Sequence, residues 1–283
     1  MRTENADFTN VRLRRQLSAR CLLRRTSAIA ALFLLASPCF LGQSVALSSD
    51  QKALTLSSAT IRSMLGKQAV TDVTFTGNVT SGPDSSEDGS VTLRALGTTE
   101  SRIELNLPEG TRTEIRGVAD AIPSGEWINQ DGSTGIFAAH NLLTDPVWFF
   151  PALGSLAGGT NVVLSYIGDE TFEGHNVFHL RSIQTGLSWP STSAISQQEL
   201  SAVDFYIDSA TLLPVATVFN EHPDNNSQVN IAVEVDFSDY QVASGIEVPM
   251  HIRRLVNGSP VMDITLTDVQ FNTGLTAAEF STN

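Results

Sequence analysis

The stretch Val229–Phe237, which reads Val-Asn-Ile-Ala-Val-Glu-Val-Asp-Phe, decides the fold, because every second residue is apolar and those between are small or polar. Successive side chains of a strand point to opposite faces, so this pattern predicts a half-buried β-strand. Val203–Asp208 alternates in the same way. Downstream, Met250–Val256 and Val261–Leu266 flank Asn257-Gly258, the pair that best tolerates positive φ at both centres of a tight hairpin turn. The region therefore predicts consecutive antiparallel strands with one apolar face.

A chain reversal is predicted after Val203–Asp208. The carboxylate of Asp208 can accept hydrogen bonds from backbone N–H groups two or three residues further on, which is typical of a turn. A second apolar run begins at Leu212. We expect its side chains Leu213, Val215, Thr217 and Phe219 to share one face, which completes a hairpin.

Residues 1–46 have the layout of a secretory signal peptide. Seven arginines precede an apolar run from Ala28 to Leu41, and Ser44-Val45-Ala46 fits a small-x-small cleavage site, so we expect cleavage between Ala46 and Leu47. A membrane anchor is the alternative, but it needs about 18 to 20 unbroken apolar residues, and Pro38 interrupts this run. A lipid-anchored start at Cys39 and a twin-arginine signal fit less well. We expect a periplasmic or secreted protein with no membrane span after signal removal.

The charge of the mature chain restricts its partners. Removal of residues 1–46 leaves 10 basic and 28 acidic residues, and hence a formal charge of −18. Such a surface excludes nucleic acid as a main partner and disfavours direct docking on an anionic membrane. Both cysteines, Cys21 and Cys39, lie in the removed segment, so we expect a monomer stabilised by one core without disulfides.

The mature chain begins with a predicted helix at 50–65. Capping side chains precede it at Ser48–Asp50, and Gly66 is placed to end it. We expect Leu54, Ile61, Met64 and Leu65 on its buried face. Further strands are expected at 70–80, 90–96, 101–107, 111–118, 126–129, 162–167 and 177–183. The acidic loop 81–89 lacks the regular ligand spacing of a calcium site, so we interpret it as a solvated turn.

Two segments break the strand pattern. Between 136 and 156 large apolar residues replace the alternation and Pro146 and Pro151 divide them, which predicts two short helices or a helix and a loop. Residues 184–200 form a polar, serine-rich excursion. At the end of the chain, Thr276 and Glu279 form a predicted capping box, with Leu275 and Phe280 as its hydrophobic staple.

Together these elements predict an α+β fold in a single domain, residues 47–283. We expect a curled antiparallel sheet, an open half-barrel of about 10 to 11 strands, with an N-terminal helix and a central helical lid or plug.

Several motifs carry a family resemblance. They are Asp204-Phe205-Tyr206-Ile207-Asp208, Thr211-Leu212-Leu213-Pro214, Asp236-Phe237-Ser238-Asp239-Tyr240, Gly245-Ile246-Glu247-Val248-Pro249, Asn257-Gly258, Phe271-Asn272 and the terminal Phe280. With them the chain resembles the outer-membrane lipoprotein carrier (LolA/LolB-like) superfamily of periplasmic proteins. The resemblance implies an open half-barrel whose hollow, covered by helices, takes a lipid or acyl group. It also implies a lid arginine, for which Arg94, Arg102 and Arg116 are the candidates.

No constellation of residues indicates chemistry. His175 and His179 would lie about 13 Å apart on a strand, too far for one metal ion, and no serine or cysteine stands in a nucleophile motif. We therefore predict no catalytic residues, no metal and no cofactor, and a protein that is not an enzyme.

The aromatic cluster Trp148, Phe149 and Phe150 has two interpretations. It either fills the hollow of the sheet as ordinary core, or it covers an apolar pocket. In the second case the floor of the pocket would be formed by Phe205, Phe219, Val233, Phe237, Met250 and Met262. We predict an exported protein that binds or carries a lipid or acyl chain by burial alone. The alternatives are a non-catalytic interaction or sensing module for an envelope protein and, less favoured, an enzyme acting on envelope lipid or glycan.

Overall fold

The computed structural model describes residues 47–82, 87–119, 122–186 and 194–281. All of them belong to one compact unit, Ala46–Asn283. The predicted signal peptide and Ala46 lie outside the described residues. No described helix is long and apolar enough to cross a membrane.

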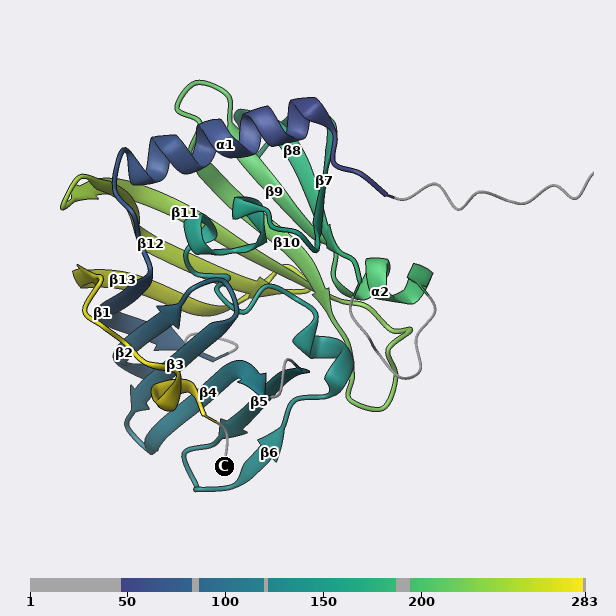
Figure 1. The fold of residues 1–283 in the computed structure, drawn as a ribbon. Coiled ribbons are helices and arrows are strands. Elements are labelled where there is room, and N and C mark those ends of the chain that lie inside the picture. Colours follow the sequence, from purple (N-terminus) through teal and green to yellow (C-terminus); the bar gives the residue numbers. More distant parts are fainter. Residues whose placement is uncertain (1–46, 83–86, 120–121, 187–193, 282–283) are drawn as a thin grey trace, which may run out of the picture. The chain divides into compact units, whose positions relative to one another are not determined.

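Thirteen strands form one antiparallel sheet in the described part of the chain, in the order β6-β5-β4-β3-β2-β1-β13-β12-β11-β10-β9-β8-β7 (Figure 1). The strands are β1 (Asp72–Ser81), β2 (Glu87–Leu96), β3 (Glu100–Leu107), β4 (Gly110–Ala119), β5 (Ile122–Ile128), β6 (Thr134–Ile136), β7 (Val162–Phe172), β8 (His175–Gln184), β9 (Val203–Asp208), β10 (Pro214–Glu221), β11 (Ile231–Ala243), β12 (Ile246–Val256) and β13 (Ser259–Phe271). Strand β1 pairs with β13 and so joins the arm β1–β6 to the arm β7–β13. The end strands β6 and β7 do not pair with each other, so the sheet is open.

The predicted α+β class and the curled, open antiparallel sheet are confirmed, but the sheet has 13 strands instead of about 10 to 11. Strand β6 has three residues and lies where the alternation of apolar and polar residues breaks down, so the sequence pattern does not predict it.

The register of the strands places one apolar face along the sheet, because directly paired residues share a face. Phe219 of β10 pairs with Val233 of β11, and Phe237 of β11 pairs with Ile252 of β12. These four side chains are buried. The sheet curls around this face, which is therefore its inner face (Figure 1).

Two predicted turns are confirmed. Asn257 and Gly258 have φ of 49° and 77°, as a tight hairpin between β12 and β13 requires. Asp208 accepts hydrogen bonds from the N–H groups of Ala210 (2.9 Å) and Thr211 (2.8 Å) between β9 and β10.

The expected common face of Leu213, Val215, Thr217 and Phe219 is wrong at Val215. The pairing of β10 with β9 shifts between Pro214 and Ala216, and an inserted residue of this kind moves the neighbouring side chain to the other face. Thr217 and Phe219 are buried, whereas Val215 lines a pocket on the outer face.

Helix α1 (Gln51–Leu65) begins and ends where the sequence predicts. Gly66 ends it with a φ of 59°. The predicted cap is wrong, because Asp50 makes no side-chain cap. Its carboxylate accepts instead from the N–H of Tyr166 (2.9 Å), and Ser49 Oγ accepts from the N–H of Leu164 (3.0 Å). The residues before the helix thus accept hydrogen bonds from backbone N–H groups on the free edge of β7.

The buried face of α1 agrees with the prediction at Met64, which is buried, and at Ile61 and Leu65, which are partly buried and pack against the core. Ala53, Ser57, Thr60 and Met64 are buried, whereas the predicted Leu54 is 40% exposed. The small residues allow a close approach to the segment 139–157, and Ser57 Oγ donates to the carbonyl of Leu156 over 2.6 Å. Hydrophobicity alone does not reveal such a face.

Residues 139–157 lie against the inner face, and we call them the plug. The plug contains three 3₁₀ helices, η1 (Ala139–Leu142), η2 (Pro151–Leu153) and η3 (Ser155–Ala157), where the sequence predicts short helices. The polar excursion contains helix α2 (Ala194–Leu200).

The chain ends on the outer face of β3 and β4. The predicted capping box is present in η4 (Ala277–Phe280), where Glu279 Oε1 accepts from the N–H of Thr276 (3.2 Å). Phe280 is buried. Gly117 permits this contact, because a Cβ there would lie 2.9 Å from the carbonyl oxygen of Phe280.

Candidate functional site

The predicted floor residues come together on the inner face of the sheet. Five of the six are buried: Phe205, Phe219, Val233, Phe237 and Met262. Met250 is half-buried and packs against the same core. They belong to β9–β13 and face the plug side of the sheet, as their alternation predicts.

The aromatic residues of the plug are the centre of this core. Trp148 is 5% exposed, and Phe149 and Phe150 are fully buried. Phe75 of β1 lies edge-on to Phe149 and Phe150, with ring centroids 6.1 and 5.3 Å apart. Phe75 was not predicted as a site residue, although its place in an alternating strand was a usable signal.

The plug fills the hollow. Where Trp148 and Val147 face Phe205 and Phe219, the remaining gap has no room for a water molecule. In this state the aromatic cluster is packed as core, so a ligand on this floor would have to displace it.

Asp145 holds the plug in its conformation. Its carboxylate accepts from the N–H (2.7 Å) and Oγ (3.0 Å) of Ser155 and from the N–H of Val147 (3.3 Å). Burial raises the pKa of Asp145, and these hydrogen bonds and the charge of Arg116 oppose the shift only in part. Sequence reasoning missed Asp145, although an acid within an apolar run signals a buried, partnered carboxylate.

Of the three candidates for a lid arginine, only Arg116 contacts the plug. Arg94 and Arg102 both bind Glu104, with their side chains on the outer face, opposite the buried Leu93 and Ile103. Arg116 is 8% exposed and lies on the inner face, where its Nη1 donates to the carbonyl of Asn141 (2.8 Å). Burial lowers the pKa of Arg116, and nearby carboxylates, Glu221 foremost, oppose this shift.

A second arginine, Arg254 of β12, also points into the hollow. It pairs with Met262 across the sheet and so belongs to the inner face. Its Nη2 donates to Glu221 Oε1 over 2.6 Å, and its guanidinium lies 5.4 Å from the ring centroid of Trp148. Sequence reasoning missed this residue, although an arginine in the apolar series Met250, Ile252, Val256 was a visible exception.

The two histidines considered as metal ligands are engaged on the outer face. His175 lies 3.2 Å from Asp208, and His179 lies 2.8 Å from Asp204. Within the described ranges no three metal-ligating side chains come together.

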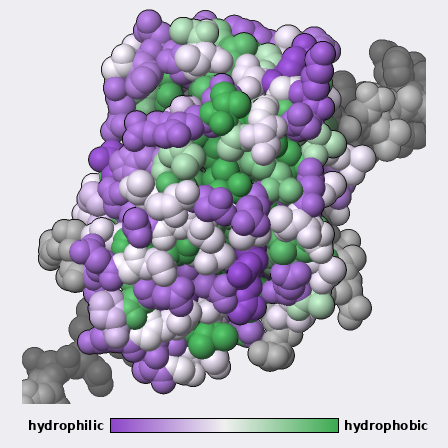
Figure 2. Space-filling model, turned by 90° about the vertical axis from the view of Figure 1, so that its left-hand side faces the viewer, coloured by the Kyte–Doolittle hydropathy of each residue, from purple (hydrophilic) through white to green (hydrophobic). Residues whose placement is uncertain are grey.

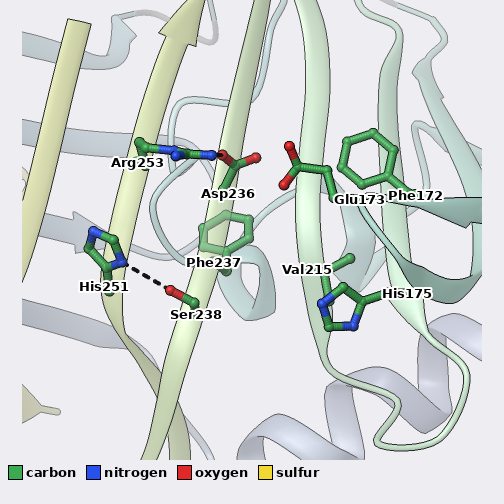
Figure 3. Close-up of a pocket in the computed structure, with 9 residues that line it drawn as sticks. All are labelled: Phe172, Glu173, His175, Val215, Asp236, Phe237, Ser238, His251 and Arg253. Carbon is green, nitrogen blue, oxygen red and sulfur yellow. Dashed lines mark hydrogen bonds and ion pairs between the residues drawn. The ribbon is translucent and has the colours of Figure 1, made fainter. Parts of the chain in front are cut away.

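The outer face carries a separate pocket of about 210 Å³, between the β7–β8 turn and strands β11 and β12 (Figure 3). Arg253 and Asp236 form an ion pair in it (2.8 Å), and His251 and Ser238 are hydrogen-bonded (3.0 Å). In the adjoining Glu234, burial, Asp236 and Glu173 raise the pKa to about 7. None of these polar groups faces the plug.

Comparison with known proteins identifies the fold. No family model and no curated protein matches the sequence. The structure matches a domain described as an outer membrane lipoprotein-sorting protein from Vibrio parahaemolyticus, with 13% identity and a TM-score of 0.51, over 81% of this chain and 96% of that one. It also matches a DUF1329 family protein from Desulfovibrio piger, with 10% identity and a TM-score of 0.51, over 83% and 98% of the two chains. This chain has a LolA-like fold.

A LolA superfamily protein from Nitrosomonas europaea also matches, with 9% identity and a TM-score of 0.47, over 81% of this chain and 97% of that one. The predicted resemblance is confirmed at the level of the fold by the two matches with a TM-score of 0.51. In this chain the inner face of the sheet is occupied by the plug, and two arginines contact the plug from the sheet.

Proposed function

We propose that the mature chain is an exported, non-catalytic protein that binds a lipid or an acyl chain between the plug and the inner face of the sheet. Trp148, Phe149 and Phe150 would move aside, and Phe205, Phe219, Val233, Phe237, Met250 and Met262 would form the floor of the site. The LolA-like fold supports this proposal, because the matched domain from Vibrio parahaemolyticus is described as a lipoprotein-sorting protein.

The observation that carries the proposal is the way in which the plug is attached. Among the described residues, the backbone–backbone hydrogen bonds of residues 138–158 all stay within that segment. Bonds to the rest of the protein involve side chains, such as Asn141 with the backbone of His222 (2.8 and 2.9 Å). The plug can therefore leave the inner face without breaking a strand pairing.

The free energy that the plug aromatics contribute by burial is comparable to the free energy that an acyl chain gains when it takes their place. Three buried aromatic side chains contribute about 3–5 kcal/mol each. An acyl chain of about 15 methylene groups gains about 12 kcal/mol on burial, at about 0.8 kcal/mol per group. A long acyl chain can therefore offset the contacts that the plug gives up.

The surface offers an apolar area that supports lipid binding. Figure 2 shows the side of the molecule at the left of Figure 1, where apolar side chains gather in the upper centre and polar ones surround them. Apolar areas framed by polar groups are typical of binding surfaces.

The test is a mass spectrum of an organic extract of the purified, exported protein. We expect one class of lipid in near-stoichiometric amount. A protein that is free of lipid after purification, and that takes up none from mixed vesicles, would contradict the proposal.

A second candidate is an interaction module for an envelope protein. It is favoured by three exposed apolar side chains near the β6 edge: Val118 (43% exposed), Ile122 (58%) and Ile136 (79%). Replacing Ile122 and Ile136 by serine would then abolish capture of one specific envelope protein by the lipid-free chain. Unchanged capture by this variant would exclude the edge as the docking surface.

A further inference from the structure

Two arginines from distant strands meet on one carboxylate inside the hollow. Arg254 Nη2 lies 2.6 Å from Glu221 Oε1, and Arg116 Nη2 lies 3.9 Å from the same oxygen. The side chains of Arg116 and Arg254 are only 10% and 12% exposed. The curl of the sheet brings them together, since β4 and β12 are five positions apart in the strand order.

Within ion-pair distance, the cluster holds two guanidiniums and one carboxylate. Glu221 is the one carboxylate in ion-pair distance of both guanidiniums among the described residues. Glu114, the next acid near Arg116, is bound to Arg112 (2.7 Å). Asp145 acts on Arg116 through its charge alone, because its hydrogen bonds go to Ser155 and Val147. In addition, Arg254 Nε is buried with no hydrogen-bond partner in the described part of the chain.

Apart from the ring of Phe137, whose centroid lies 4.6 Å from the Arg116 guanidinium, the remaining contacts of both arginines among the described residues are with the plug. Arg116 Nη1 donates to the carbonyl of Asn141 (2.8 Å) and to Thr144 Oγ1 (3.3 Å). The Arg254 guanidinium lies over the ring of Trp148. Displacement of the plug removes these partners and leaves two guanidiniums on one carboxylate in a mostly apolar hollow, which is unfavourable.

We infer that the ligand carries an anionic oxygen group, a carboxylate or a phosphate, which Arg116 and Arg254 bind when the plug moves aside. This inference rests on the proposed function. A guanidinium presents its N–H groups in a planar fork that matches both kinds of anion. The acyl chain of the same molecule would then lie on the apolar floor, next to Arg254 on β11 and β13.

The experiment compares three amphiphiles that carry the same palmitoyl chain. They are palmitate, palmitoyl lysophosphatidic acid and the uncharged monopalmitoylglycerol, titrated into the wild-type protein at pH 8.5 below their micelle concentrations. We expect at least one anionic amphiphile to bind ten times or more as tightly as the uncharged one. The stronger of the two anions identifies the group as carboxylate or phosphate.

Two variants test whether Arg254 is responsible for this preference. Arg254→Gln should lose the preference for the anion and bind the uncharged amphiphile as the wild type does. Arg253→Gln is the matched control, because Arg253 is the next residue along β12, lies on the outer face and is paired with Asp236. It should keep the full preference.

The outcomes separate the inference from the function on which it rests. Equal binding of all three amphiphiles by the wild type overturns the inference and leaves lipid binding intact. Binding of none of them overturns both. The wild-type comparison needs no variant, so a poorly folded Arg254→Gln would not prevent a decision.

Discussion

Val233 and Glu234 are neighbours in β11 whose side chains point to opposite faces of the sheet. Val233 is fully buried on the inner face, and Glu234 lies on the outer face. We predict that Val233→Asp unfolds the protein, because burying an unpaired carboxylate costs several kcal/mol out of a total stability of about 5–15 kcal/mol. Glu234→Ala should remain folded. Thermal melts of both variants at pH 7 check this, and equal melting temperatures would show that the faces are wrongly assigned.

Glu234 also makes the stability depend on pH. Its pKa is raised from 4.5 to about 7, chiefly by burial and by Asp236. The folded state therefore binds the proton more tightly than the unfolded state, and the stability from this group is complete below pH 4.5 and is lost as the pH rises through about 7.

The neutral variant Glu234→Gln should escape this loss. We expect it to exceed the wild type at pH 8 by about 1 kcal/mol, a value reduced for solvent exposure, which corresponds to about 2–4 °C in Tm. At pH 4 the two proteins should melt together. A constant difference between pH 4 and pH 8 would contradict the assigned titration.

Among the elements, the β12–β13 hairpin depends on the backbone of its turn. Gly258 has a φ of 77°, and a Cβ there would meet no atom within 4 Å. The cost of Gly258→Ala is therefore conformational, and we predict a loss of about 1 kcal/mol. Gly168→Ala is the control, because that site is equally open but does not have a left-handed φ. Denaturant unfolding of both variants decides this, and equal midpoints would contradict the prediction.

The elements differ in how far the sequence predicts them. Strands with one buried face, such as β11, follow from their alternation, and turns such as Asn257-Gly258 follow from local backbone preferences. The burial of Ala53, Ser57 and Thr60 on α1 does not follow from hydrophobicity, because these residues are buried on account of their small size. The edge contact of Asp50 also requires knowledge of β7, which lies more than a hundred residues away in the sequence.

The residues of the candidate site also differ in how far the sequence predicts them. The floor residues, such as Phe205 and Val233, lie in regular strands and are predictable from their spacing. The polar groups that hold the plug depend on partners far away in the chain, as for Arg116 with Asn141 or Arg254 with Glu221. The sequence signal of Arg254 was a single charge in an apolar series, whereas Arg116 was a candidate through the family resemblance, and neither signal names the partner.

At the scale of the whole molecule, export should produce a defined mature chain. We predict an N-terminus at or next to Leu47, because Ser44-Val45-Ala46 follows the apolar run as a cleavage site does. Leu47 lies two residues before Ser49, which binds the edge of β7 together with Asp50. N-terminal sequencing of exported protein checks this. An intact N-terminus on membrane-held protein would favour an anchor, and a lipid on Cys39 would indicate a lipoprotein.

The fluorescence of Trp148 reports whether an amphiphile displaces the plug. Trp148 is 5% exposed and packed on the inner face, so its emission reports whether the plug stays in place. In a Trp127→Phe, Trp189→Phe background, Trp148 is the one tryptophan left. We predict that palmitate or a palmitoyl lysophospholipid, added below its micelle concentration, shifts this emission in a saturable way. An emission spectrum that no amphiphile changes would show that the plug is permanent core and would contradict the account.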